Sequence, residues 1–265
     1  QKKFSQLRKS GLKYSFAGGA HKWYGFTPLN AFSAKMIDLQ FGVAQKNSIN
    51  DFMVTLWGDD GAECSYFSVF SSLAYLGEKN LFGAKGFANG LCKRLTGYRY
   101  TELQALDLPN QLYDSKNIKL CNPSKYLFYV DPLLGIEEFT SAPDYVDRYK
   151  NAAARLKTLA KRRTGFSYLY KTAYRLCDYL EIKSTLTEDI DKAYKSGDKA
   201  GLSKICYEKM PQAEKRLQAF IRAFQTQWTT ENRPFGFEVE EYRLYGALGR
   251  LSKKKKKLSA YVSGK

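Results

Sequence analysis

A buried strand is indicated by residues 52–58, which read Phe52-Met53-Val54-Thr55-Leu56-Trp57-Gly58. The turn Asp59-Asp60-Gly61 follows, and apolar residues then recur at helical spacing from Phe67 to Gly77, which predicts an amphipathic helix. The same order occurs earlier, because the run from Tyr14 to Gly19 precedes a helical pattern that starts at the capping residue Asn30 and stops at Asn47. Two consecutive strand–helix units imply parallel strands.

Two parallel strands cannot form a stable sheet by themselves, because parallel sheets are buried on both faces and need neighbouring strands. The chain starts with Gln1 rather than Met, and it reads directly into Phe4-Ser5-Gln6-Leu7-Arg8, which is typical of the end of a helix. We therefore expect the chain to be a piece of a longer protein, with further strands upstream.

The second half of the chain is predicted to be helical. Residues 82–145 show no regular hydrophobic pattern and are interrupted by Asn, Pro and Gly. They predict a connector with short helices that either covers the core or contacts a partner or substrate. After Pro143, helical stripes run over residues 149–160, 166–180, 190–194 and 217–228, with an entry or kink at Pro211, and they predict an antiparallel bundle. A short amphipathic run from Tyr242 to Leu251 then precedes five lysines.

The predicted fold class is therefore α/β followed by all-α, with three parts. Residues 1–95 form the strand–helix part, residues 96–145 the connector and residues 146–265 the helical domain. The strand–helix part and the helical domain are each long enough to bury a core of their own.

Composition restricts the class of protein. The chain has 265 residues, with 43 Lys and Arg against 26 Asp and Glu, for a net charge of +17. Five of these charges form the run Lys253–Lys257, which we interpret as a solvated tail, so we expect no specific nucleic-acid partner. A basic nucleic-acid-binding module stays open as an alternative. No stretch is apolar enough to span a membrane, and we expect no membrane partner.

No motif indicates a cofactor or metal. The five cysteines, Cys64, Cys92, Cys121, Cys177 and Cys206, are widely spaced without a Cys-x-x-Cys pair, so buried free thiols are favoured over a disulfide frame or a zinc site. Free thiols favour a cytoplasmic location, which a signal peptide on an upstream segment would overturn. Phosphate-binding, dinucleotide-binding and zinc-protease motifs are absent from the sequence, so we expect no cofactor.

The residues best suited to chemistry follow the strand at 52–58. Trp57, Asp59, Asp60 and Glu63 lie at its carboxyl end, where loops after parallel strands build active sites. An aromatic ring beside carboxylates suits a sugar, because the ring covers the apolar face of a pyranose while the carboxylates accept hydrogen bonds from its hydroxyls. For Asp60 and Glu63, stabilising a helix start is an equally good interpretation.

The loop after the first strand, Gly18 to Phe26, directs further aromatic residues the same way, Trp23 among them. His21 is the only histidine. Because the sequence places no nucleophile or orienting acid beside it, a hydrogen-bonding surface role is favoured over a catalytic one.

Three separated motifs resemble glycoside hydrolase family 20, the β-N-acetylhexosaminidases, and specifically the C-terminal part of the bacterial branch with a helical C-terminal domain. They are Phe16-Ala17-Gly18-Gly19 with Lys22-Trp23; Val54 through Cys64; and Pro234 through Val239 with Arg243-Leu244. Their order and spacing extend the resemblance over nearly the whole chain.

The resemblance implies a (β/α)8 (TIM) barrel whose last two βα units lie in this chain, followed by the helical domain. It also implies a hydrolase that removes terminal β-linked GlcNAc or GalNAc with retention, in a reaction in which the substrate's acetamido carbonyl attacks the anomeric carbon. An Asp-Glu pair on an earlier strand orients the acetamido group and protonates the leaving oxygen. This chain contains no Asp-Glu dipeptide, so we expect no catalytic residue in it and no activity from it alone.

By position, the resemblance makes Trp57 a wall of the acetamido pocket and Asp59 the acid that binds the sugar hydroxyls remote from the cleaved bond, where the wider family more often has Glu. Trp23 would line the same pocket, and His21 stands where this branch is expected to have tryptophan, which affects the outer subsite. The implied partners are the terminal N-acetylhexosamine of glycans or glycoconjugates and the upstream part of the barrel. A carbohydrate-binding or scaffold protein without catalysis stays open as a further alternative.

Overall fold

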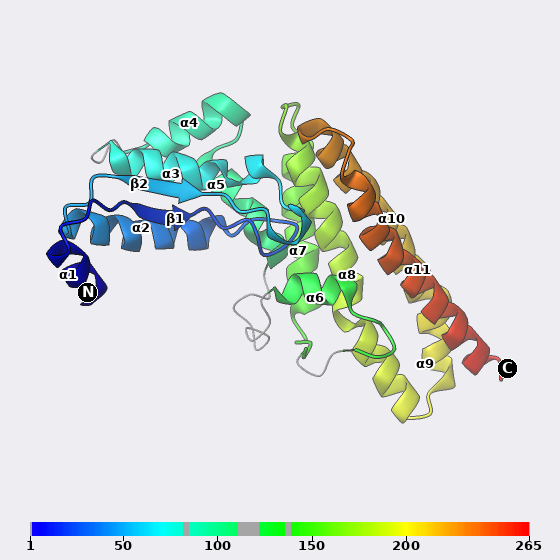
Figure 1. Cartoon of the computed structure of the whole chain (residues 1–265). Helices are drawn as coiled ribbons and strands as arrows, with labels where there is room; N and C mark the ends of the chain where they lie inside the picture. The colour runs from blue at the N-terminus through cyan, green and yellow to red at the C-terminus, as the bar shows by residue number, and fades with distance from the viewer. Residues whose placement is uncertain (1, 82–84, 111–121, 136–138, 265) are drawn as a thin grey trace.

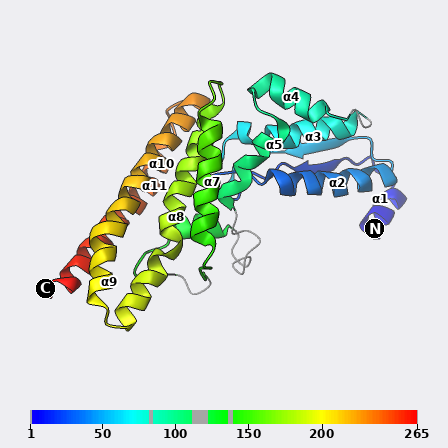
Figure 2. The same cartoon turned by 180° about the vertical axis from the view of Figure 1, so that it is seen from behind.

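The computed structural model describes residues 2–81, 85–110, 122–135 and 139–264. An α/β part at the N-terminus projects from a set of long helices that form the C-terminal half (Figure 1). In the view from behind, the N-terminal helix α1 (Lys2–Lys9) again lies at the end far from the C-terminus (Figure 2). The described residues are mostly helical and hold one small parallel sheet.

The sheet confirms the predicted parallel pairing. Strands β1 (Phe16–Gly19) and β2 (Phe52–Thr55) are in register from Phe16 opposite Phe52 to Gly19 opposite Thr55. Helix α2 (Asn30–Lys46) packs on β1, and a Cβ at Gly18 would collide with the Gln40 side chain. Helix α3 (Phe70–Asn80) packs on α2. Both strands are shorter than predicted, so Trp57 lies in the loop after β2.

Part of the opposite face of the sheet is exposed. Ala17 and Met53, which are register partners, both lie exposed, and 53% of the Met53 surface is accessible. Within the described residues the sheet has two strands and no barrel is closed. Parallel sheets are normally covered on both sides.

The N-terminus of helix α2 is capped by a residue that is distant in the sequence. The Asp107 carboxylate accepts hydrogen bonds from the backbone N–H groups of Asn30 (2.8 Å) and Ala31 (2.7 Å). The prediction of Asn30 as the cap was wrong, because its side-chain amide instead donates to the Ser68 carbonyl (3.0 Å). Asp107 lies in the 3₁₀ segment Gln104–Asn110 of the connector, so the cap attaches the connector to the α/β part.

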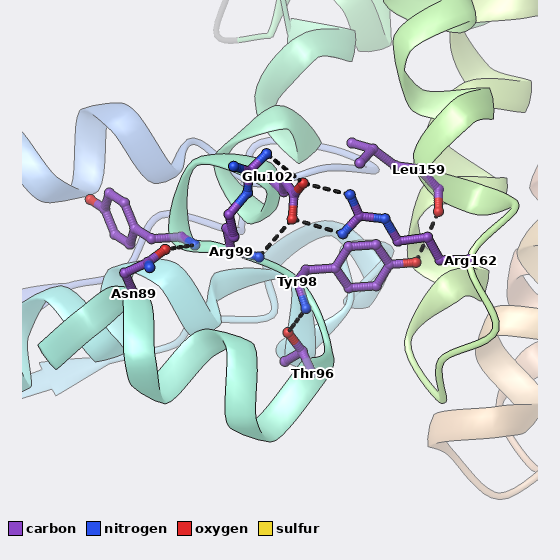
Figure 3. A network of polar contacts seen from close by, with 8 residues as sticks. Asn89, Thr96, Tyr98, Arg99, Glu102, Leu159 and Arg162 are labelled. Carbon is purple, nitrogen blue, oxygen red and sulfur yellow. Dashed lines mark hydrogen bonds and ion pairs between the residues drawn. The ribbon is translucent and has the colours of Figure 1, made fainter. Parts of the chain in front are cut away.

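Short helices occupy the connector region, as predicted. They are α5 (Tyr100–Leu103) and α6 (Pro123–Tyr129). A further short helix, α4 (Phe87–Thr96), lies just before the connector. Figure 3 shows how α5 is attached to the long helices: the Glu102 carboxylate accepts two hydrogen bonds from Arg162 (2.9 and 2.6 Å). It accepts two more from Arg99, through the side chain (3.0 Å) and the backbone N–H (2.7 Å). The Tyr98 hydroxyl donates to the Leu159 carbonyl at 3.0 Å.

The C-terminal half consists of α7 (Tyr145–Ala160), α8 (Ser167–Lys195), α9 (Lys199–Lys204), α10 (Met210–Glu231) and α11 (Phe237–Val262). In both views α7 lies beside α8 and α10 beside α11, and apolar residues such as Leu180, Leu217 and Phe220 are fully buried between them. The predicted separate helix at 190–194 is the C-terminal end of α8. Pro211 follows a π-helical turn at Ile205–Lys209 inside a helical run that continues from α9 into α10, so it neither starts nor ends a helix.

The lysine run was wrongly predicted to be a solvated tail. Helix α11 continues through Lys253–Lys257, because Leu251 and Leu258 are buried on its inner side. Lys254 forms an ion pair with Asp131 (3.0 Å), and Lys255 forms one with Glu214. The run is therefore part of the folded domain.

Cys64, Cys92, Cys177 and Cys206 are buried free thiols, as predicted, and Cys121 lies outside the described residues. Among the residues that the structure describes, no helix combines the length and apolarity needed to cross a bilayer.

Candidate functional site

A cleft of about 920 Å³ lies where the α/β part meets the helical half. One side is formed by the loops after β1 and β2, and the other by α6, the residues that follow it and the first turns of α11. Its lining residues are Trp23, Tyr24, Asp59, Glu63, Asn122, Lys125, Tyr126, Tyr129, Val130, Asp131, Gly135 and Arg243. Both aromatic rings and charged groups line it, and its volume is in the range of small-ligand sites.

Three of the predicted site residues, Trp23, Asp59 and Glu63, meet in this cleft. Trp57 is not among its lining residues and is 59% exposed. The side chain of Asp60 lies outside the described residues. The structure therefore brings together residues of both strand-end loops and adds a wall from α6 that the sequence pattern did not indicate.

The loop after β1 is fixed at both ends by close backbone approaches. The Trp23 indole lies on Gly19, where a Cβ would be 2.7 Å from the ring. At Gly25 a Cβ would be 2.6 Å from the Asn122 amide nitrogen, and that amide donates to the Tyr24 carbonyl. Asn122 also caps α6 by accepting from the Lys125 N–H (2.8 Å). One side chain thus holds the β1 loop against the start of α6.

A buried charge cluster forms the base of the cleft. The Glu63 side chain is 1% exposed, and its carboxylate lies 2.7 Å from the Lys125 ammonium and 3.6 Å from the Arg243 guanidinium. The Tyr129 hydroxyl donates to it at 3.4 Å. Burial, and next the negative charge of Glu63, raise the pKa of the Tyr129 hydroxyl, which keeps it a neutral donor.

A second buried carboxylate, Glu240, completes this cluster. It lies 3.6 Å from the Arg243 guanidinium. Burial, followed by repulsion from Glu63, raises the pKa of Glu240 to about 7, as expected for like charges that are both withdrawn from water. The two cations from α6 and α11 therefore lie next to two carboxylates, which limits the net charge of the cleft floor.

Lys22 joins the two strand-end loops. Its ammonium donates to the Trp57 carbonyl (3.2 Å) and lies 3.7 Å from the centre of the Tyr66 ring. The side chain is buried, and burial lowers the pKa of this lysine. The contact of Lys22 with the second loop could not be predicted from the sequence, because 35 residues separate the partners.

His21 is half-buried and packs among aromatic rings. Its ring lies 4.4 Å from the Trp23 ring and 4.7 Å from the Phe32 ring, centre to centre. Burial lowers the pKa of the imidazole. The Ser33 hydroxyl is 3.5 Å from Nδ1, but Ser33 is fully buried and its hydroxyl donates to the Leu29 carbonyl (2.8 Å). Ser33 is therefore placed for structure and not for attack on a substrate.

The C-terminal end of α6 is held by cations from the long helices. Arg250 donates to the Tyr129 carbonyl (2.8 Å), and Lys183 donates to the Val130 carbonyl (2.8 Å). Positive charge is favourable at a helix C-terminus. Because Lys183 is completely buried, its pKa is lowered to about 7. These contacts fix the wall that carries Tyr126 and Tyr129.

Comparison with protein families identifies the C-terminal part of the chain. Residues 99–265 match the family described as the glycoside hydrolase 20C C-terminal domain. The chain belongs to this family, which confirms the resemblance found in the sequence. Curated proteins show no match to the chain. The matched region includes α6 and α11, and so it includes one wall of the cleft.

Proposed function

We propose that this chain is the C-terminal part of an exo-acting, retaining β-N-acetylhexosaminidase. The enzyme removes terminal β-linked GlcNAc or GalNAc by substrate-assisted hydrolysis, and the catalytic Asp-Glu pair lies outside this chain. Membership of the glycoside hydrolase 20C C-terminal domain family supports this proposal. The observation that carries it is the cleft in which Trp23 and Asp59, from two adjacent strand-end loops, lie together.

The exposed part of the sheet supports the barrel part of the proposal. Residues 1–95 would be the last two βα units of a (β/α)8 barrel, and the exposed face with Ala17 and Met53 would be covered by the upstream strands. Side chains of a closed barrel fill its interior, which accounts for apolar residues on a face that the described helices do not fully cover.

In the proposed site the chain's own residues bind and orient the sugar. Trp57 would form a wall of the acetamido pocket, Trp23 would line the same pocket, and the Asp59 carboxylate would accept hydrogen bonds from the hydroxyls remote from the cleaved bond. Holding the acetamido oxygen near the anomeric carbon replaces an encounter in solution with an intramolecular attack. The water-exposed Trp57 ring (59%) is free to be covered by a sugar.

The natural full-length protein tests the proposal with an aryl N-acetyl-β-glucosaminide as substrate. We expect hydrolysis with retention, and Trp57→Ala should lower kcat/KM by at least about tenfold, because attack geometry is lost. Tyr194→Ala is the matched control, since Tyr194 is equally exposed (58%) but lies on α8 outside the cleft. Unchanged turnover in Trp57→Ala would refute the assignment.

The 265-residue chain alone should show no hydrolysis, because it contains no Asp-Glu dipeptide. If the full-length protein binds N-acetylglucosamine but never cleaves it, a carbohydrate-binding protein becomes the better description. If it binds nucleic acid with an affinity that falls steeply with salt, the basic-module alternative is favoured.

A further inference from the structure

The loop that carries Trp57 and Asp59 is anchored by Glu63, whose partners come from the helical half. Lys125 and Tyr129 lie on α6, and Arg243 lies on α11. Both helices belong to the region that matches the C-terminal domain family. An unpaired carboxylate at this depth would be strongly destabilising, so the cations of the helical domain stabilise this path of the loop.

Arg243 makes a second contact with the same loop. Gly61 adopts a left-handed backbone (φ +94°), and a Cβ there would lie 2.7 Å from the Arg243 guanidinium and would also collide with the Glu240 carboxylate. The guanidinium is 3.6 Å from both Glu63 and Glu240. It therefore links the two buried carboxylates while lying against the backbone two residues after Asp59.

We propose that Arg243 is a positioning residue for sugar recognition, which holds the segment 59–63 so that the Asp59 carboxylate meets the hydroxyls remote from the cleaved bond. This inference rests on the proposed function. It gives the helical domain a direct part in specificity, because α11 then sets the position of an acid that belongs to the α/β part.

The inference predicts an effect on epimer preference. GlcNAc and GalNAc differ only in the configuration at C4, so a displaced Asp59 changes the two reactions unequally. Partial loss of a hydrogen bond to a charged group is expected to change the ratio of the two kcat/KM values by about five- to tenfold. A loss of folding stability alone lowers both values by the same factor.

The experiment measures kcat and KM of the full-length protein with the aryl β-glycosides of GlcNAc and GalNAc. Arg243→Ala should change the ratio, and Arg243→Lys should restore much of it, because the positive charge is kept. Lys255→Ala is the matched control: it removes a cation from the same helix, but Lys255 pairs with Glu214 on α10 and does not line the cleft. Its ratio should equal that of the wild type.

Equal losses with both substrates in Arg243→Ala would overturn the inference and leave Arg243 a merely structural residue. If Arg243→Ala does not fold, Arg243→Gln gives the same test, because it removes the guanidinium and keeps more of the side chain. An unchanged ratio in folded Arg243→Gln would count against the inference. A wild-type protein that cleaves neither substrate contradicts the proposed function instead, so the two failures are distinguishable.

Discussion

The attachment of α5 to the long helices depends on Glu102, and Glu102→Gln should weaken it measurably. The carboxylate, 8% exposed, accepts from Arg162 through both oxygens and from the Arg99 backbone and side chain. The amide of glutamine cannot accept through two oxygens and carries no charge. The substitution keeps the size of the side chain, so packing is not the cause of the loss.

The magnitude follows from the pKa. Hydrogen bonds from Arg162, with those from Arg99, lower the pKa of Glu102 from its ordinary 4.5 to about 2, which corresponds to about 3 kcal/mol at 1.36 kcal/mol per pH unit. The Arg162 side chain is 42% exposed, and solvent screens its charge, so we expect a loss of about 1.5–2 kcal/mol at pH 7.

Urea unfolding followed by the helical signal at 222 nm measures this loss. The free energy of unfolding should also depend on pH: since the folded pKa is depressed, the contribution is complete above about pH 5 and disappears as the pH falls toward 2. Glu102→Gln should remove that part of the pH dependence. The control Asp144→Asn breaks an exposed ion pair with Arg148 and should cost less than about 0.5 kcal/mol. Equal losses in the two variants would refute the reasoning.

Two further predictions concern Gly61 and Lys183. Gly61→Ala should destabilise the protein by about 2 kcal/mol, measured by the same unfolding assay, because its left-handed backbone and the Arg243 and Glu240 side chains leave no room for a Cβ. Gly246→Ala, in open space on α11, should instead stabilise by about 0.5–1 kcal/mol, and similar values for both would contradict the close approach. Because the pKa of Lys183 is lowered from 10.5 to about 7, the unfolded chain binds more protons between these values, so stability should rise with pH across this window. Lys183→Met should flatten that rise, and an unchanged slope would show that Lys183 is not its source.

Local sequence patterns predicted the helices and strands well where apolar residues recur with a single period. The strand–helix order and the start of α2 at Asn30 were correct because alternating apolar runs and the 3.6-residue period are properties of the chain itself. The single helix α8 was missed because Thr185, Glu188 and Asp189 interrupt its apolar stripe; Thr185 and Asp189 interact with Lys209, and Glu188 accepts from Ser141. A pattern along the sequence does not show such partners.

The candidate site was predicted only on one side. Strand-end position identified Trp23, Asp59 and Glu63, and all three line the cleft. The opposite wall on α6 was not predicted, since its short segment carries no motif and reaches the cleft through contacts with distant residues. Asn122 contacts Tyr24, and Lys125 contacts Glu63. The partners are far apart in the sequence, so no local pattern predicts these contacts.

The sequence by itself determined the parallel strand–helix units, the helical second half, the free thiols and the family, because each depends on residue type and spacing along the chain. The tertiary structure alone decided which charges are buried together. Glu63, Lys125, Glu240 and Arg243 are spread over three distant segments, and only folding brings them within ion-pair distance. There, loss of hydration makes their pairing and their pKa values depend on one another.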